Sequence, residues 1–242
     1  MSIRTLVILA LVGLFAIALT GCDPEKAAGV SDNQPKAAKD DSSTKSGGDA
    51  VKTPERAMLP AKEAPENGDQ VAVIDTDKGQ IVFMFYPEVA PKTVANFISL
   101  ANKGFYNGTR FHRTIENFMI QGGDPNSKDL TKSASWGMGG NTDASGKEIT
   151  VPAEFSKIKH VRGIVSMARS QDPNSASSQF FIVHGDSSFL DGQYTAFGKV
   201  VSGINVVDEI AKLPVQDNNG TVFPNRAVVI KKISIQTWPL KS

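Results

Sequence analysis

Apolar and polar positions follow a regular pattern only from about Asp69 onward. Residues 70–86 predict two strands joined by a turn at Asp77-Lys78-Gly79, because Val71 and Val73 lie two positions apart, as on one face of a strand. This part of the chain is therefore expected to form one globular domain, residues 69–242.

The pattern then changes to helical spacing over residues 90–108, where Gly104 is placed to cap the C-terminus. Four apolar residues fall on one helical face: Val94, Phe97, Ile98 and Ala101. A second, shorter helix is predicted at 204–213.

Short β-like runs separated by glycine occupy most of the remaining domain. They lie at 111–121, 163–168, 179–184 and 196–201, and a final strand is predicted at 227–238. Many short strands, long loops and two helices favour a closed antiparallel barrel with helical caps over a parallel α/β fold.

Residues 23–68 carry very few large apolar side chains, namely Val30, Val51, Met58 and Leu59. So few cannot offset the entropy of ordering the segment, so a disordered linker is predicted. As a flexible tether it would average on the order of 35–40 Å end to end. A charged binding arm is the alternative, but no block of like charges supports it.

Residues 1–22 have the layout of a secretory signal: Arg4, an apolar run from Leu6 to Leu19, and then small residues. The last four residues resemble the lipobox of bacterial lipoproteins, which ends at a lipidated cysteine. Cys22 is the only cysteine of the chain. We therefore expect a lipid-anchored protein of the cell envelope that faces the periplasm or the exterior, with a plain membrane anchor or a cleaved soluble form as alternatives.

Composition excludes several classes of function. The 26 Lys and Arg residues against 25 Asp and Glu residues give a net charge of +1, which provides no electrostatic basis for binding nucleic acid. A single cysteine excludes an internal disulfide and a cysteine-rich zinc site.

Other candidate sites are weak. His112, His160 and His184 lack acidic or thiol partners at ligand spacing, so no metal is expected. Residues 141–148 resemble the start of a calcium loop, but Pro152 stands where that loop needs a bidentate glutamate. No nucleophile-elbow spacing supports a hydrolase near His184. Two glycosylation sequons, at Asn107 and Asn219, are interpreted as loop residues.

Segment 111–124 combines apolar side chains with two polar ones, Arg113 and Gln121. Burying a lone guanidinium is expensive, so Arg113 must pair with an acid, lie at the surface, or face a ligand. A surface salt bridge is the simpler alternative. The close neighbours Phe118 and Met119 favour a pocket wall.

Residues 163–200 likewise combine apolar side chains with an amide, that of Gln179. The two stretches together closely resemble cyclophilin-type peptidyl-prolyl cis-trans isomerases. The motifs FHR, FMxQGGD, SMA, SQFFI and LDG occur in order at 111–113, 118–124, 166–168, 178–182 and 190–192. The resemblance covers residues 71–235. It implies a closed eight-stranded antiparallel β-barrel capped by two α-helices, and an enzyme that assists the folding of exported proteins.

By the same resemblance, Arg113 is the catalytic residue, and it donates to the proline nitrogen in the transition state. The implied substrate-binding residues are Phe118, Met119, Gln121, Ala168, Arg169, Gln179, Phe181, Phe189, Leu190 and Tyr194. Three of them depart from the commonest eukaryotic pattern: Phe189 replaces a tryptophan that binds cyclosporin, Tyr194 a histidine, and Arg169 an asparagine. Weak inhibition by cyclosporin is therefore expected.

The expected partners are proline-containing segments of unfolded or exported proteins, and the membrane through the lipid anchor. No cofactor, metal or nucleic acid is expected, and the protein is predicted to be a monomer. Two other classes remain as alternatives: a chaperone-like binding module whose catalysis is incidental, and an unrelated β-barrel carrier with an internal cavity.

Overall fold

The computed structural model of the protein describes residues 62–241. The predicted signal peptide, the lipidation site Cys22 and most of the predicted linker lie outside the described residues. The strands of the described part are β1 (Gln70–Thr76), β2 (Gly79–Phe85), β3 (Arg113–Ile115), β4 (Met119–Gly122), β5 (Ile164–Met167), β6 (Phe180–Val183), β7 (Ala196–Ser202) and β8 (Ile230–Thr237). The helices are α1 (Pro91–Asn102) and α2 (Ile204–Ala211), with the 3-10 turns η2 (Pro125–Lys128), η3 (Leu130–Ser135) and η4 (Ser188–Leu190).

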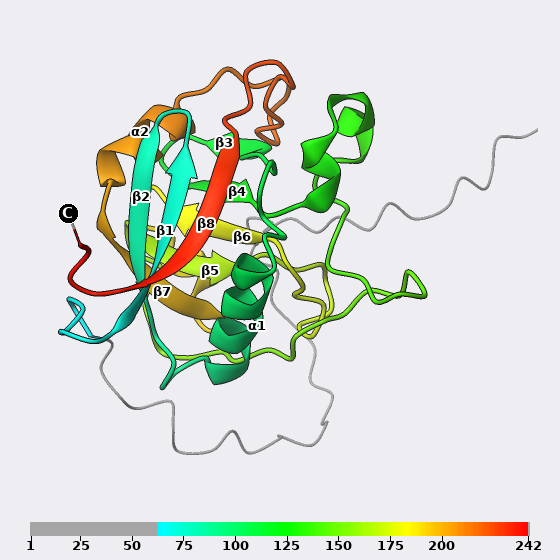
Figure 1. Ribbon diagram of the computed structural model, residues 1–242. Coiled ribbons are helices and arrows are strands. Elements are labelled where there is room, and N and C mark those ends of the chain that lie inside the picture. Colours follow the sequence, from blue (N-terminus) through cyan, green and yellow to red (C-terminus); the bar gives the residue numbers. More distant parts are fainter. Residues whose placement is uncertain (1–61, 242) are drawn as a thin grey trace, which may run out of the picture. The chain divides into compact units, whose positions relative to one another are not determined.

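All eight strands form one antiparallel sheet in the order β3-β4-β6-β5-β7-β2-β1-β8, curled into a half-barrel (Figure 1). The closed barrel that the sequence predicted is not found, because β3 and β8 do not pair as strands. The segment before β3 meets the start of β8 instead, through an isolated bridge between Arg110 and Val229 and backbone hydrogen bonds that include those of Gly108 and Thr109 with Ile230. The outer edge of β3 is occupied instead by residues 220–222 of the loop between α2 and β8, which bridge to Arg113 through Thr221.

Both predicted helices are confirmed. Pro91 opens α1, where its missing N–H costs nothing, and Gly104 follows the helix with φ +68°. The buried side of α1 centres on Phe97, which lies within 6 Å of five other aromatic rings: Phe83, Phe85, Tyr106, Phe180 and Phe197. Neither helix of the described part has the length and hydropathy that a membrane span requires.

Side chains alternate between the two faces of each strand, and the core divides accordingly. The larger cluster contains the buried apolar residues of both helices together with strand residues such as Ile120 and Ile182. The second cluster contains the alternate strand residues, among them Met119 and Phe181. The helices therefore cover one face of this part of the sheet, and the predicted site residues belong to the other.

Candidate active site

Strand register brings the central residues of the predicted site into one row. Arg113 on β3 lies opposite Gln121 on β4, and Gln121 lies opposite Phe181 on β6. Directly paired residues of an antiparallel ladder share a face, and Met119, two positions before Gln121, shares it as well. The sheet therefore places a cation, an amide and two apolar side chains side by side.

Arg113 is held from two directions and only 5% of it is exposed. Its Nε donates to the carbonyl of Asn219 at 2.6 Å. On the other side its Nη1 lies 3.5 Å from Oε1 of Gln121 and 3.9 Å from Sδ of Met119. The short bond thus comes from the α2–β8 loop, whereas the contact with Gln121 is at the limit of hydrogen-bond distance.

Gln121 continues a chain of buried amides. Its Nε2 donates to Oε1 of Gln179 at 2.9 Å, and Nε2 of Gln179 donates to the carbonyls of Gly137 and Gly139. The backbone carbonyl of Gln179 also accepts the N–H of Ala168 at 3.0 Å. A small hollow beside this chain is lined by Gly139, Glu148, Ala168, Ser175, Ser177 and Gln179. The structure therefore connects Gln179 and Ala168 to the Arg113 row.

Aromatic side chains form the other side of the site. Phe181 and Tyr194 meet edge to face with their centroids 5.8 Å apart, and the guanidinium of Arg169 lies 4.6 Å from the Tyr194 ring. The rings of Phe118 and Phe189 lie 5.3 Å apart. Leu190 and Phe181 are fully buried, whereas Phe189 is 39% exposed, so the set runs from a buried floor to an exposed rim.

A buried polar group that the sequence did not predict lies behind Phe181. The ring of His160 stacks on Phe181 at 6.2 Å, with Nδ1 3.2 Å from Asp191 and Nε2 3.1 Å from the hydroxyl of Ser166. These are the residue types of a hydrolytic triad, but Ser166 and His160 are buried at 0% and 1% exposure. The hydroxyl of Ser166 is occupied by the His160 ring, and that ring packs on Phe181, so we interpret the group as structural support for Phe181. Burial lowers the pKa of His160, although Asp191 acts in the opposite direction.

Asn219 was also missed, because the sequence predicted only a loop residue there. The Asp217–Gly220 turn carries a recognisable turn composition, which is a signal for a turn and not for a partner of Arg113. Its position against β3 is a long-range contact that no local motif encodes.

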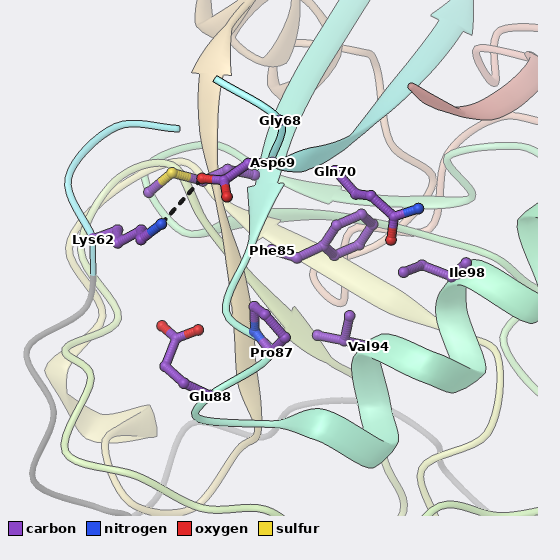
Figure 2. A pocket seen from close by; sticks show the side chains of 10 residues that line it. Lys62, Gly68, Asp69, Gln70, Phe85, Pro87, Glu88, Val94 and Ile98 are labelled. Carbon is purple, nitrogen blue, oxygen red and sulfur yellow. Dashed lines mark hydrogen bonds and ion pairs between the residues drawn. The ribbon is translucent and has the colours of Figure 1, made fainter. Parts of the chain in front are cut away.

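A separate hollow of about 200 Å³ lies between the first two strands and α1 (Figure 2). Phe85, Val94 and Ile98 give it an apolar side, and the ion pair between Lys62 and Asp69 lies at its rim. None of its lining residues belongs to the predicted site. Within residues 62–241, no group of three or more His, Cys, Asp or Glu side chains is placed to hold a metal ion.

The fold and these contacts define a mainly β protein whose curled sheet carries a buried cationic donor beside apolar side chains. The sequence profile of the family "Cyclophilin type peptidyl-prolyl cis-trans isomerase/CLD" matches residues 71–235. The chain belongs to this family, and the protein is a peptidyl-prolyl cis-trans isomerase that binds proline-containing peptides.

Similar proteins agree with this assignment. The "Probable peptidyl-prolyl cis-trans isomerase" of Brucella abortus is 43% identical over 167 residues, which cover 68% of this chain and 81% of the relative. The human "Peptidyl-prolyl cis-trans isomerase-like 3" is 42% identical over 69% of this chain and 96% of its own length. A cyclophilin type isomerase from Cryptosporidium parvum, crystallised in the presence of the dipeptide Ala-Pro, has a TM-score of 0.59 and 32% identity over 69% of this chain and 99% of that chain.

Proposed function

We propose that Arg113 accelerates isomerisation by donating a hydrogen bond to the proline nitrogen in the twisted transition state. Rotation about an X-Pro amide breaks its resonance, against a barrier of ~18–20 kcal/mol. As resonance is lost, the nitrogen regains a lone pair that the planar ground state lacks. A donor that meets this lone pair stabilises the transition state alone, and this raises turnover.

The observation that carries the proposal is a nearly buried guanidinium in one row with Gln121 and Phe181. Arginine keeps its charge at neutral pH and presents several donors in a rigid plane. Because little of Arg113 is in contact with water, its donors act in a medium where electrostatic interactions are stronger.

The donor alone does not account for the rate. Raising an uncatalysed ~0.01 per second to ~1,000 per second requires about 7 kcal/mol. One preorganised donor supplies ~3–4 kcal/mol. The remainder is assigned to residues that bind the peptide and restrict rotation to one side of the bond.

We assign the binding roles from the family resemblance, which the arrangement of the site supports. The proline ring enters the apolar surface formed by Phe118, Met119, Phe181 and Leu190. Gln121 binds the substrate backbone together with the main chain of Ala168 and Arg169. Gln179 lines the neighbouring groove, and Phe189 and Tyr194 form the rim.

The experiment is an isomerisation assay on an Ala-Pro peptide with the full-length protein. Arg113→Ala is expected to lower kcat/KM by about 10²–10³-fold, because one transition-state donor is lost. Circular dichroism of the variant is expected to match the wild type, since backbone hydrogen bonds at His112 and Thr114 still hold the loop to β3. Near-wild-type activity in a folded variant would refute the role of Arg113.

The proposal also includes the cellular site. The protein is exported, lipidated at Cys22 and held at the cell envelope, where it assists the folding of exported proteins. The support is the residue pattern of 1–22. Metabolic labelling with palmitate checks it: the wild type is expected to incorporate the label and Cys22→Ser to lose it, and a wild type that takes up no label contradicts lipid anchoring.

A further inference from the structure

The α2–β8 loop is organised by one carboxylate, that of Asp217. Its Oδ1 accepts the backbone N–H groups of Asn219 and Thr221, each at 3.0 Å, and its Oδ2 accepts the hydroxyl of Thr221 at 2.8 Å. Partial desolvation would raise the pKa of Asp217, but these hydrogen bonds outweigh it and the pKa is lowered. The carboxylate therefore accepts these bonds in its ionised form at neutral pH.

The turn that Asp217 closes is fastened along β3. The carbonyl of Gly220 accepts the N–H of Thr114 at 2.8 Å, and the N–H of Val222 donates to the carbonyl of His112 at 3.0 Å. Gly220 has φ +84°, and a Cβ there would overlap the carbonyl of Thr114 and lie 2.6 Å from Cγ1 of Ile115. The turn thus has no room to shift against the strand that carries Arg113.

The carbonyl of Asn219 lies in the chain between Asp217 and Gly220, the first residue bonded to β3. It accepts Nε–H of Arg113 at 2.6 Å. A bond to Nε fixes the plane of the guanidinium, because the group is rigid and planar. The terminal nitrogen Nη1 is then directed toward Met119 and Gln121. The orientation of the donor therefore depends on where the loop holds one carbonyl oxygen.

We propose that Asp217 is a positioning residue for catalysis: by closing the 217–221 turn it holds the Asn219 carbonyl against Nε and so aims the guanidinium of Arg113 at the substrate. The inference rests on the proposed role of Arg113 and extends it to a residue that touches no substrate. The physical basis is that a misplacement of about 1 Å at a reacting group costs up to ~10²-fold in rate.

The test measures kcat and KM of the full-length protein on an Ala-Pro peptide. Asp217→Ala is expected to lower kcat by about tenfold with little change in KM, because the apolar binding residues are untouched. Asp217→Asn is expected to stay within about twofold of the wild type, because an asparagine Oδ1 accepts the same backbone N–H groups.

Asp143→Ala is the matched control. Asp143 accepts the N–H groups two and four positions further on, those of Ser145 and Lys147, as Asp217 does, and it also accepts the hydroxyl of Ser145 in an exposed loop. It is expected to leave kcat within about twofold, since it disturbs an equivalent turn elsewhere. An equal loss in Asp143→Ala and Asp217→Ala would overturn the inference. If Asp217→Ala fails to fold, Thr221→Val replaces it, with an expected loss of kcat of about threefold from one missing bond.

A double-mutant cycle separates this inference from the proposed function. In the Arg113→Ala background, adding Asp217→Ala is expected to cause no further loss, because Asp217 acts through Arg113. A full tenfold loss in that background overturns the positioning role. If Arg113→Ala is impaired but Asp217→Ala is fully active, only the present inference is overturned; if Arg113→Ala is itself fully active, the proposed function fails.

Discussion

Arg113 combines two requirements that usually conflict, a permanent charge and near-complete burial. Its desolvation is offset by a short, charge-assisted bond to the Asn219 carbonyl and by the polar contact with Gln121. The side chain is thus preorganised before any peptide binds, which is what makes a donor effective in a transition state.

Arg113→Lys tests whether this geometry matters as well as the charge. Lysine keeps the positive charge but lacks the planar fork, so it cannot bond the Asn219 carbonyl and reach toward Gln121 at once. We expect kcat to fall by at least about tenfold, because the preorganised orientation is lost. Steady-state kinetics on an Ala-Pro peptide check this, and wild-type kcat in the lysine variant would mean that charge alone suffices.

Much of the site at the residue level was predictable from the sequence. Arg113, Gln121 and Phe181 were predicted through their motifs, and the register places them in one row. Asn219 was not predictable, because the relevant group is its backbone carbonyl, which carries no residue identity. His160 was missed because its partners Ser166 and Asp191 are separated from it in sequence and meet only in the folded chain.

At the level of elements, the run 111–121 was predicted as one β-like segment and is in fact a hairpin. Asn117 adopts φ +61° in the turn between β3 and β4, a conformation that asparagine tolerates better than most residues. The turn is tied to the residue that follows β6, because the N–H of Asn117 donates to Nδ1 of His184 at 2.8 Å. This hairpin is what places Met119 on the same face as Arg113.

Gly203 offers a test of how the second helix is joined to the sheet. It precedes α2 with φ +80°, and an added Cβ would overlap the carbonyl of Gln80 at the start of β2. Gly203→Ala is expected to lower the free energy of unfolding by more than about 3 kcal/mol, because backbone strain and steric overlap add.

Gly146→Ala is the matched control for that prediction. Gly146 has φ +83°, and a Cβ there would meet nothing within 4 Å. It is expected to cost only the strain of the left-handed conformation, about 1–2 kcal/mol. Chemical denaturation measures both variants, and equal losses would show that the overlap with Gln80 relaxes freely.

For the described part of the chain as a whole, stability is expected to depend on pH through buried histidines. Burial lowers the pKa of both His160 and His112 below the usual 6.5. The negative charge of Asp191 raises the pKa of His160, and that of Asp124 raises the pKa of His112, but burial outweighs both. The positive charge of Arg113 lowers the pKa of His112 further. Below pH 6.5 the unfolded chain therefore binds protons that the folded chain does not.

Because the unfolded chain binds more protons, acidification favours unfolding. The free energy of unfolding is expected to fall as the pH drops from about 7.5 through 6.5 toward the folded pKa values. Denaturation across this range checks the prediction, and His160→Gln is expected to show a shallower fall because one titrating group is removed. A wild-type stability that stays flat or rises on acidification would contradict it.

The fold class was predictable because strand alternation, helical spacing and glycine positions all indicate short antiparallel strands with two helices. The closure of the barrel was not, because the pairing of β3 with residues 220–222 instead of β8 depends on contacts about 100 positions apart in the sequence. The domain bounds, the lipid anchor and the monomeric state stay predictions.

The most direct test of the central claim separates binding from turnover in Arg113→Ala. Exchange NMR on an Ala-Pro peptide saturating the enzyme gives the isomerisation rate of the bound peptide, and a titration gives its Kd. If the guanidinium meets the nitrogen lone pair only during rotation, the bound rate falls about 10²–10³-fold while Kd changes less than about threefold. A variant that loses affinity by that factor but isomerises bound peptide at the wild-type rate would contradict the account.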